Sequence, residues 1–205
     1  MGTSQSQSSP RSASWNQVRR LYASGASTGE LAGAIANAIP DATLEAATRA
    51  PLCSLVGSVA EARALEVEDR HAWLGDQLAQ AADLGHDLTA SLARAAALRS
   101  LTALADSAPS VRIEMTAGVF AAEYLAALFE YYVERDVHEF IGGPALATVG
   151  AAGDLCEAVA AEARAAVMAQ ADQQAPPTGE TAGALVAMLM LGAVAALRGR
   201  ASLGA

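Results

Sequence analysis

The chain has 205 residues, enough for one domain with a sizeable core, and 53% of them are hydrophobic, largely because alanine is abundant. Only 4% are aromatic, which favours closely packed helices over strands. The net charge is -9 and all 13 basic residues are arginines, so the composition excludes lysine chemistry and argues against direct binding of nucleic acid. We therefore predict an all-α protein, a compact multi-helix bundle.

The first fourteen residues, MGTSQSQSSPRSAS, are small and polar. Such a segment cannot bury enough apolar surface to offset the entropy lost on ordering, so we predict a flexible tail at residues 1–14 and a helical domain at residues 15–205. An apolar set at helical spacing from Trp15 to Tyr22 predicts the first helix, with Ser14 as its N-cap and Gly25 as its end.

Several further helices follow from local signals. Ser27 and Glu30 have the spacing of a capping box and predict a helix that Pro40 closes. The run 51–65 is predicted as one helix, and the near-heptad pattern over 73–101 as one long amphipathic helix or two.

The stretch from Phe120 to Phe140 contains all three phenylalanines and three of the four tyrosines. In a chain so rich in alanine, this helix is predicted to be the hub of the core, ending at the Gly142-Gly143-Pro144 signal. An alanine-rich helix at 145–171 and a linker near 170–180 precede the last segment.

The last segment, Thr181 to Leu197, has no charged residue. Its length is at the lower limit for crossing a bilayer, which needs about 20 residues. The same composition suits a central helix or an oligomer interface, which we favour, and membrane contact stays open as the alternative.

Few residues indicate catalysis or metal binding. Glu130, Glu134 and His138 are spaced to share one helix face and could bind a divalent metal, but an acidic face is more simply interpreted as solvated. His71 and His86 lack a nucleophile motif beside them, so we predict no catalytic residue, no metal site and no cofactor. Cys53 and Cys156 lack a CxxC partner and are interpreted as structural thiols of a reducing, cytoplasmic compartment.

The amino terminus carries a different signal. A small residue after Met1 favours removal of that methionine, which would leave the free amine of Gly2 at the start of the chain. The first six residues also fit the M-G-x-x-x-[ST] pattern of N-myristoylation, a largely eukaryotic modification.

The opening MGTSQSQSSP, followed by Trp15, resembles the MGTSxSxxxP start and later tryptophan of QatB-like proteins, components of bacterial Qat anti-phage defence systems. The similarity covers the first fifteen residues. It implies a non-enzymatic protein whose Gly2 is presented to a QueC-like enzyme (7-cyano-7-deazaguanine synthase-like) and modified with a deazaguanine-type group. By the same resemblance, Thr3, Ser4 and Ser6 would be read by that enzyme, and an ATPase of the same system would be a further partner.

A second hypothesis comes from the opposite end of the chain. A helical protein that associates with membranes or with other protein chains could act through the apolar segment Thr181 to Leu197.

Overall fold

The computed structural model describes residues 13–47, 50–80, 87–105, 113–173 and 181–203. Within these ranges the chain is helical and has no strand, and its helices pack together, which confirms the predicted all-α bundle. The elements are α1 (Ala13–Ser24), α2 (Thr28–Ala38), α3 (Asp41–Ala47), α4 (Ala50–Arg63), α5 (Arg70–Gln80), α6 (Leu88–Ala103), α7 (Ile113–Val137), the short 3-10 helix η2 (His138–Phe140), α8 (Val149–Gln173) and α9 (Ala182–Leu203).

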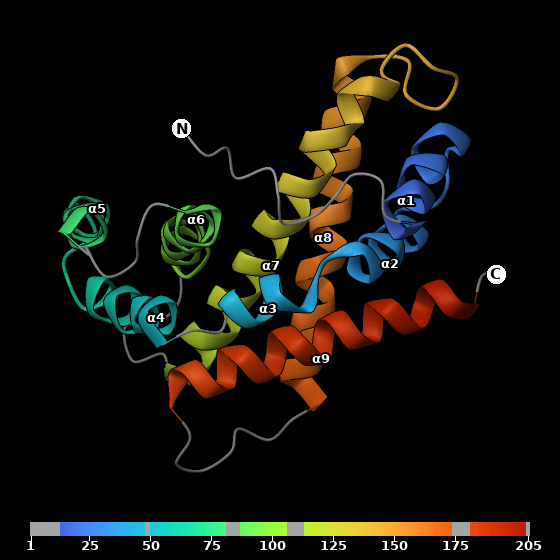
Figure 1. The fold of residues 1–205 in the computed structure, drawn as a ribbon. Coiled ribbons are helices and arrows are strands. Elements are labelled where there is room, and N and C mark those ends of the chain that lie inside the picture. The colour runs from blue at the N-terminus through green and yellow to red at the C-terminus, as the bar shows by residue number, and fades with distance from the viewer. Residues whose placement is uncertain (1–12, 48–49, 81–86, 106–112, 174–180, 204–205) are drawn as a thin grey trace.

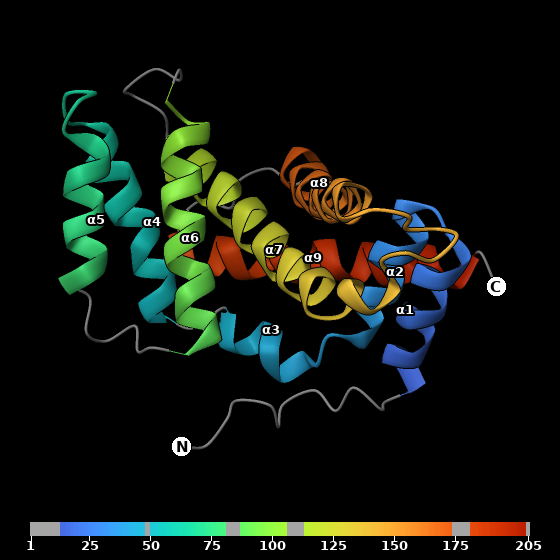
Figure 2. The same ribbon diagram turned by 90° about the horizontal axis from the view of Figure 1, so that it is seen from above.

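The two long helices α7 and α8 form an antiparallel pair at the centre of the molecule, and α9 crosses both of them (Figure 1). Seen from above, α4, α5 and α6 lie at one end of this arrangement, and α1 and α2 lie at the other (Figure 2). Helix α9 also packs against α2 and α4, so it links the two ends. The last helix of the chain is therefore part of the core of the bundle.

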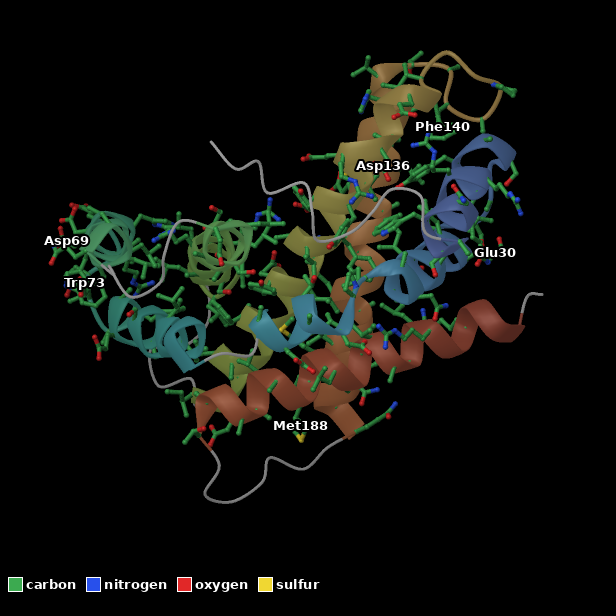
Figure 3. The ribbon with its side chains drawn as sticks, in the orientation of Figure 1. Glu30, Asp69, Trp73, Asp136, Phe140 and Met188 are labelled. Atoms are coloured by element: carbon green, nitrogen blue, oxygen red, sulfur yellow. The ribbon has the colours of Figure 1, made fainter. Side chains whose placement is uncertain are left out.

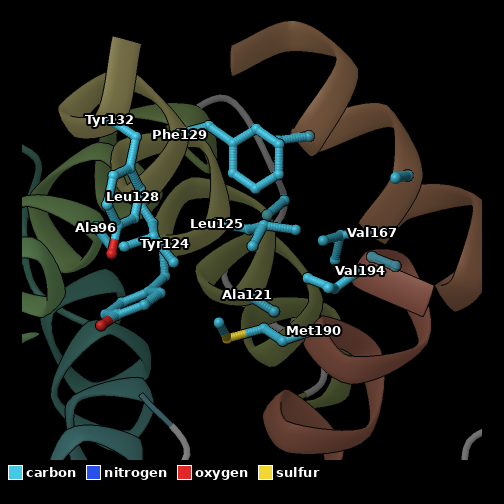
Figure 4. Close-up of a cluster of buried hydrophobic side chains, with 14 of the residues drawn as sticks. Ala96, Ala121, Tyr124, Leu125, Leu128, Phe129, Tyr132, Val167, Met190 and Val194 are labelled. Carbon is cyan, nitrogen blue, oxygen red and sulfur yellow. The ribbon is translucent and has the colours of Figure 1, made fainter. Parts of the chain in front are cut away.

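Helix α7 is the hub of the core, as predicted. Figure 4 shows Leu125 directed toward Val167 of α8 and Val194 of α9, while Tyr124 and Tyr132 point to the other side of α7. All five of these side chains are at most 3% exposed. Burying a large apolar side chain contributes about 1.5–3 kcal/mol, so the aromatic content of this helix supplies much of the core energy of an otherwise alanine-rich chain.

The predicted capping box of α2 is present. The Ser27 hydroxyl accepts a hydrogen bond from the Glu30 backbone N–H at 3.3 Å, and the Glu30 carboxylate accepts one from the Ser27 N–H at 3.0 Å. At α1 the N-cap prediction is wrong, because the helix already includes Ser14 and begins at Ala13. Of the predicted tail, residues 1–12 lie outside the described residues.

The pattern over 73–101 corresponds to two helices, α5 and α6. Helix α6 begins at an N-cap that the sequence analysis missed, Asp87, whose carboxylate accepts a hydrogen bond from the Ala90 N–H at 2.8 Å. The predicted helix at 51–65 corresponds to α4.

The carboxyl end of α7 differs in detail from the prediction. The α-helix stops at Val137, and η2 carries the chain onward to Phe140. Gly142 then adopts a φ of 89°, a conformation that glycine reaches without steric cost, and its N–H donates to the Leu146 carbonyl at 2.7 Å. Farther on, α8 extends to Gln173, so helix covers the first part of the predicted linker; residues 174–180 lie outside the described residues.

Candidate functional site

The residues that the sequence analysis selected for modification and partner binding, Gly2, Thr3, Ser4 and Ser6, lie outside the described residues. The structure instead describes the point at which this segment joins the helical body, the start of α1 at Ala13. The candidate site therefore comprises α1 and the side chains that hold it in place.

Trp15 is the main anchor of α1. Its side chain is only 1% exposed, and its ring centroid lies 4.8 Å from that of Tyr132 on α7. The guanidinium carbon of Arg135 lies 4.3 Å from the Trp15 ring centroid and 5.1 Å from that of Tyr132. A cation over two aromatic rings stabilises this contact electrostatically, in addition to the buried apolar area.

The orientation of Arg135 is fixed by the next residue in the chain. Its Nε and Nη2 atoms each donate a hydrogen bond of 2.7 Å to the carboxylate of Asp136, one to each oxygen. Asp136 is only 5% exposed, and a buried carboxylate needs such a partner to offset the loss of hydration. The two hydrogen bonds therefore satisfy the buried Asp136 carboxyl group and direct the Arg135 guanidinium toward Trp15.

A second set of contacts lies one to two helical turns farther along α1. Arg19 forms an ion pair with Glu139, and its guanidinium carbon lies 5.4 Å from the ring centroid of Phe140. The hydrogen bond from Arg19 lowers the pKa of the Glu139 carboxyl below its ordinary value. The Tyr22 ring centroid also lies 5.4 Å from that of Phe140. Figure 3 labels Asp136 and Phe140, which mark this part of the molecule beside α1.

The Tyr22 hydroxyl is an unusual element of this contact. It is buried and has no hydrogen-bond partner among the residues that the structure describes, and burial raises the pKa of the phenol well above its ordinary value. Tyr22 therefore remains neutral and acts in packing. Together the two sets of contacts dock α1 onto the carboxyl end of α7 and onto η2.

The three residues considered for metal binding have different environments. The Glu130 carboxylate forms ion pairs with Arg99 of α6 at 2.6 Å and with Arg164 of α8 at 3.6 Å. Glu134 and His138 are exposed, and His138 belongs to η2. Among the residues that the structure describes, no group of three or more His, Cys, Asp or Glu side chains could hold a metal ion.

The prediction of a solvated acidic face on α7 is thus correct only near its end. Glu123, on the same face, is 9% exposed, and its carboxylate accepts a hydrogen bond of 2.9 Å from Arg164 Nε. Arginines from two neighbouring helices cover this part of the face. Nothing in the sequence of α7 indicates those partners, because they lie in distant segments of the chain.

The remaining candidates for chemistry take structural positions or lie outside the described side chains. A ring nitrogen of His71 lies 3.1 Å from the Thr102 hydroxyl, which joins α5 to α6. Cys156 is buried, and burial raises the pKa of its thiol to about 11, so the interpretation as an unreactive structural thiol fits its surroundings. His86 and the side chain of Cys53 lie outside the described part of the structure.

Helix α9 is long and apolar enough, over Ala182–Arg200, to cross a membrane by length and composition, and 39% of that window is buried in the structure. Its inward side packs against α2, α4, α7 and α8. Near its end, Arg198 donates hydrogen bonds to the carbonyl of Ala36 at 2.9 Å and to that of Ile39 at 3.2 Å. These contacts fix α9 within the bundle and leave its opposite side facing outward.

Comparison of the chain with family models, with curated proteins and with solved structures gives no match.

Proposed function

We propose that this chain is a non-enzymatic component of a bacterial anti-phage defence system, and that a QueC-like partner enzyme modifies its N-terminal glycine with a deazaguanine-type group in the cytoplasm. The observation that carries the proposal is the docking of α1, whose Trp15 is 1% exposed and stacked against Tyr132 and Arg135. Because α1 is docked, the segment that precedes it is attached to the helical body at a fixed point, Ala13. The opening residues that resemble those of QatB-like proteins come directly before this attachment point in the sequence.

The chemistry of Gly2 suits this role. After removal of Met1 the chain begins with an α-amine, whose ordinary pKa is near 8, so a substantial fraction is unprotonated and nucleophilic at physiological pH. Glycine has no side chain to obstruct the approach of an enzyme-bound electrophile. The small polar side chains of Thr3, Ser4 and Ser6 would fit an extended binding groove, in which backbone hydrogen bonds provide affinity and shallow pockets provide specificity.

Chain geometry limits the distance between Ala13 at the start of α1 and the Gly2 amine. About eleven residues separate the Gly2 amine from Ala13, and a fully extended chain spans at most about 3.3–3.6 Å per residue. Gly2 can therefore lie no farther than about 40 Å from the start of α1. That reach allows the amine to enter an active site while the acidic helical body stays outside it, in contact with another surface of the enzyme or with the ATPase.

The experiment is co-expression with the genes that neighbour this one, followed by intact-mass and peptide mass spectrometry. The expected product lacks Met1 and carries an added nucleobase-sized mass on Gly2. The variant Gly2→Pro also permits methionine removal but replaces the primary amine by a hindered secondary one, so it should remain unmodified. In the matched control Gly2→Ala, the primary amine is retained and modification should persist at a reduced level.

A second variant separates recognition from chemistry. Replacing Thr3, Ser4 and Ser6 together by alanine leaves Gly2 intact and should reduce the modified fraction. An unmodified wild-type amino terminus in the presence of both partners, or full defence activity of the Gly2→Pro variant, would refute the proposal.

A further inference from the structure

The outward face of α1 is polar and takes no part in the polar contacts of the fold. Trp15 is buried on the inward face of this helix, whereas Asn16, Gln17 and Arg20 are exposed. Since successive residues turn by about 100° around a helix, these three side chains point away from the buried face. None of them forms a hydrogen bond, an ion pair or a ring contact with the residues that the structure describes. We call Asn16, Gln17 and Arg20 the polar face of α1.

Arg20 differs in this respect from the other arginines that the structure describes. Its neighbour Arg19 is paired with Glu139, and Arg135 is paired with Asp136. The arginines of the later helices also contact carboxylates, backbone carbonyls or other groups of their own chain. The positive charge of Arg20 is therefore not neutralised by a carboxylate of the described residues, and it is available to a partner.

Charge is distributed unevenly along the chain. Residues 1–29 contain three arginines and no acidic residue, which gives them a net charge of +3. The residues from Glu30 onward contain ten arginines and all 22 acidic residues, a net charge of -12. Helix α1 belongs to the cationic part and lies at one end of the molecule, with α4 and α5 at the other (Figure 2). An acidic surface is therefore attracted to α1 and repelled by most of the remaining protein.

We propose that the modifying enzyme docks on the polar face of α1, and that it does so through an acidic patch beside the entrance to its active site. This inference rests on the proposed function and identifies the part of the helical body that the enzyme recognises. In the docked complex a carboxylate of the enzyme pairs with Arg20. The amide side chains of Asn16 and Gln17 donate and accept hydrogen bonds at the edge of the same contact.

The position of the polar face suits an enzyme that acts on Gly2. Arg20 lies seven residues, or about 10 Å of helix, from Ala13, where the N-terminal segment is attached. An enzyme bound at this face can accept that segment, which spans at most about 40 Å, into an active site beside the contact. Such tethering raises the effective concentration of the Gly2 amine at the active site, so that a weak docking contact is sufficient.

The polar face is also held in one orientation. The buried Trp15 ring and the ion pair between Arg19 and Glu139 fix α1 on the helical body. Docking on a helix that is already fixed orders only surface side chains, which keeps its entropic cost low. A single exposed ion pair contributes little by itself, so the affinity depends on the N-terminal segment and the polar face acting together.

Initial rates of Gly2 modification, measured with the purified partner enzyme at several concentrations of the full chain, test the proposal. Arg20→Gln should raise the half-saturating concentration about three- to fivefold at low sodium chloride and leave the maximal rate unchanged, since it removes one partly exposed ion pair. Arg20→Glu should raise it about tenfold, because it adds repulsion. Arg20→Lys retains the charge and should behave nearly as wild type. The effect of Arg20→Gln should shrink as sodium chloride is added.

The matched control is Val67→Glu, which changes the net charge by the same amount as Arg20→Gln at a 68% exposed site between α4 and α5. This variant should have the half-saturating concentration of the wild type, because it lies at the opposite end of the molecule from α1 (Figure 2). Melting temperatures of all variants should match that of the wild type, since the exchanged side chains are exposed.

The outcomes separate this inference from the proposed function. An unmodified wild-type amino terminus would overturn the proposed function and the docking surface with it. Modification of the wild type with an unchanged half-saturating concentration in Arg20→Glu would overturn the docking surface alone, as would an equal rise in Val67→Glu. A lower maximal rate at an unchanged half-saturating concentration would assign Arg20 to a step after binding and would overturn it too. If the effect of Arg20→Gln disappears once the enzyme is treated with nuclease, a nucleic acid is the anion on this face and the proposal fails.

Discussion

Replacing Trp15 by alanine is expected to weaken the docking of α1 more than any other single change in that helix. The side chain is 1% exposed, and truncating a core tryptophan typically costs about 3–5 kcal/mol because the cavity closes only in part. The Arg135 guanidinium, 4.3 Å from the ring centroid, loses one of its two aromatic partners, which adds about 0.5–2 kcal/mol. Because Arg135 keeps Tyr132 and Asp136 as partners, the added loss lies at the low end of that range, and we expect a total loss of about 4–5 kcal/mol.

A loss of this size is a large part of the 5–15 kcal/mol that separates folded from unfolded domains. It corresponds to a fall of about 10 °C in the melting temperature of a chain of this length. Urea denaturation followed by far-ultraviolet circular dichroism measures the free energy directly. The matched control is Trp73→Ala on α5, where the ring is only half-buried and the expected loss is about 1–2 kcal/mol.

The chain has two tryptophans, so each variant leaves one fluorescent reporter at one end of the molecule. In Trp73→Ala, the fluorescence of Trp15 reports the docking of α1, and it should change in the same urea range as the helix signal. A loss below about 1 kcal/mol in Trp15→Ala would refute the packing argument. A Trp15 transition well before the helix signal would show that α1 undocks separately from the rest of the bundle.

Three further predictions concern local features. Gly142→Ala should destabilise the fold by about 1–2 kcal/mol, because the backbone at this position has a φ of 89°. Gly153→Ala should stabilise it by about 0.5–1 kcal/mol, because this residue lies within α8 and an added Cβ meets nothing within 4 Å. Melting temperatures that shift in the same direction for both variants would contradict this contrast. Ser27→Ala should cost about 1 kcal/mol at neutral pH. Hydrogen bonds from Ser27 lower the pKa of the Glu30 carboxyl group in the folded protein. The Glu30 carboxylate therefore stabilises the fold above its unfolded pKa of about 4.3, and this contribution is lost as the pH falls through the lower pKa of the folded state. The melting temperature of Ser27→Ala, measured as a function of pH, should fall less steeply on acidification than that of the wild type. Cys156 should react with a thiol reagent only slowly at pH 7.5, since the pKa of its thiol is raised to about 11, and rapid labelling at this site in the folded protein would be inconsistent with its burial.

Several elements could be predicted from short stretches of the sequence alone. The Ser27–Glu30 box is complete within four residues, and the turn at Gly142 depends on the conformational freedom of that residue alone. The concentration of aromatic residues between Phe120 and Phe140 also identified the hub, because six of the nine aromatic side chains of the chain lie in this one segment. Such features are predictable when cause and effect lie in the same short segment.

The docking of α1 was not predictable in this way. Its contacts join Trp15 and Arg19 to residues more than a hundred positions away, and no pattern within α7 distinguishes Arg135 or Asp136 from an ordinary exposed pair. The arginine cover over Glu123 has the same origin, since Arg164 comes from α8. Interactions of this kind exist only after distant helices are brought side by side.

By itself, the sequence determined that the chain is helical, where several of its helices begin or end, and that Gly2 follows Met1 in a segment of small polar side chains. These properties follow from backbone propensity, capping and composition, which act over a few residues. Only the tertiary structure decided which side of α9 is core and which side is surface, because the segment is apolar all round and its periodicity contains no preference. Burial against α2, α4, α7 and α8 made that choice, and it left Met188 and Leu191 on the outside.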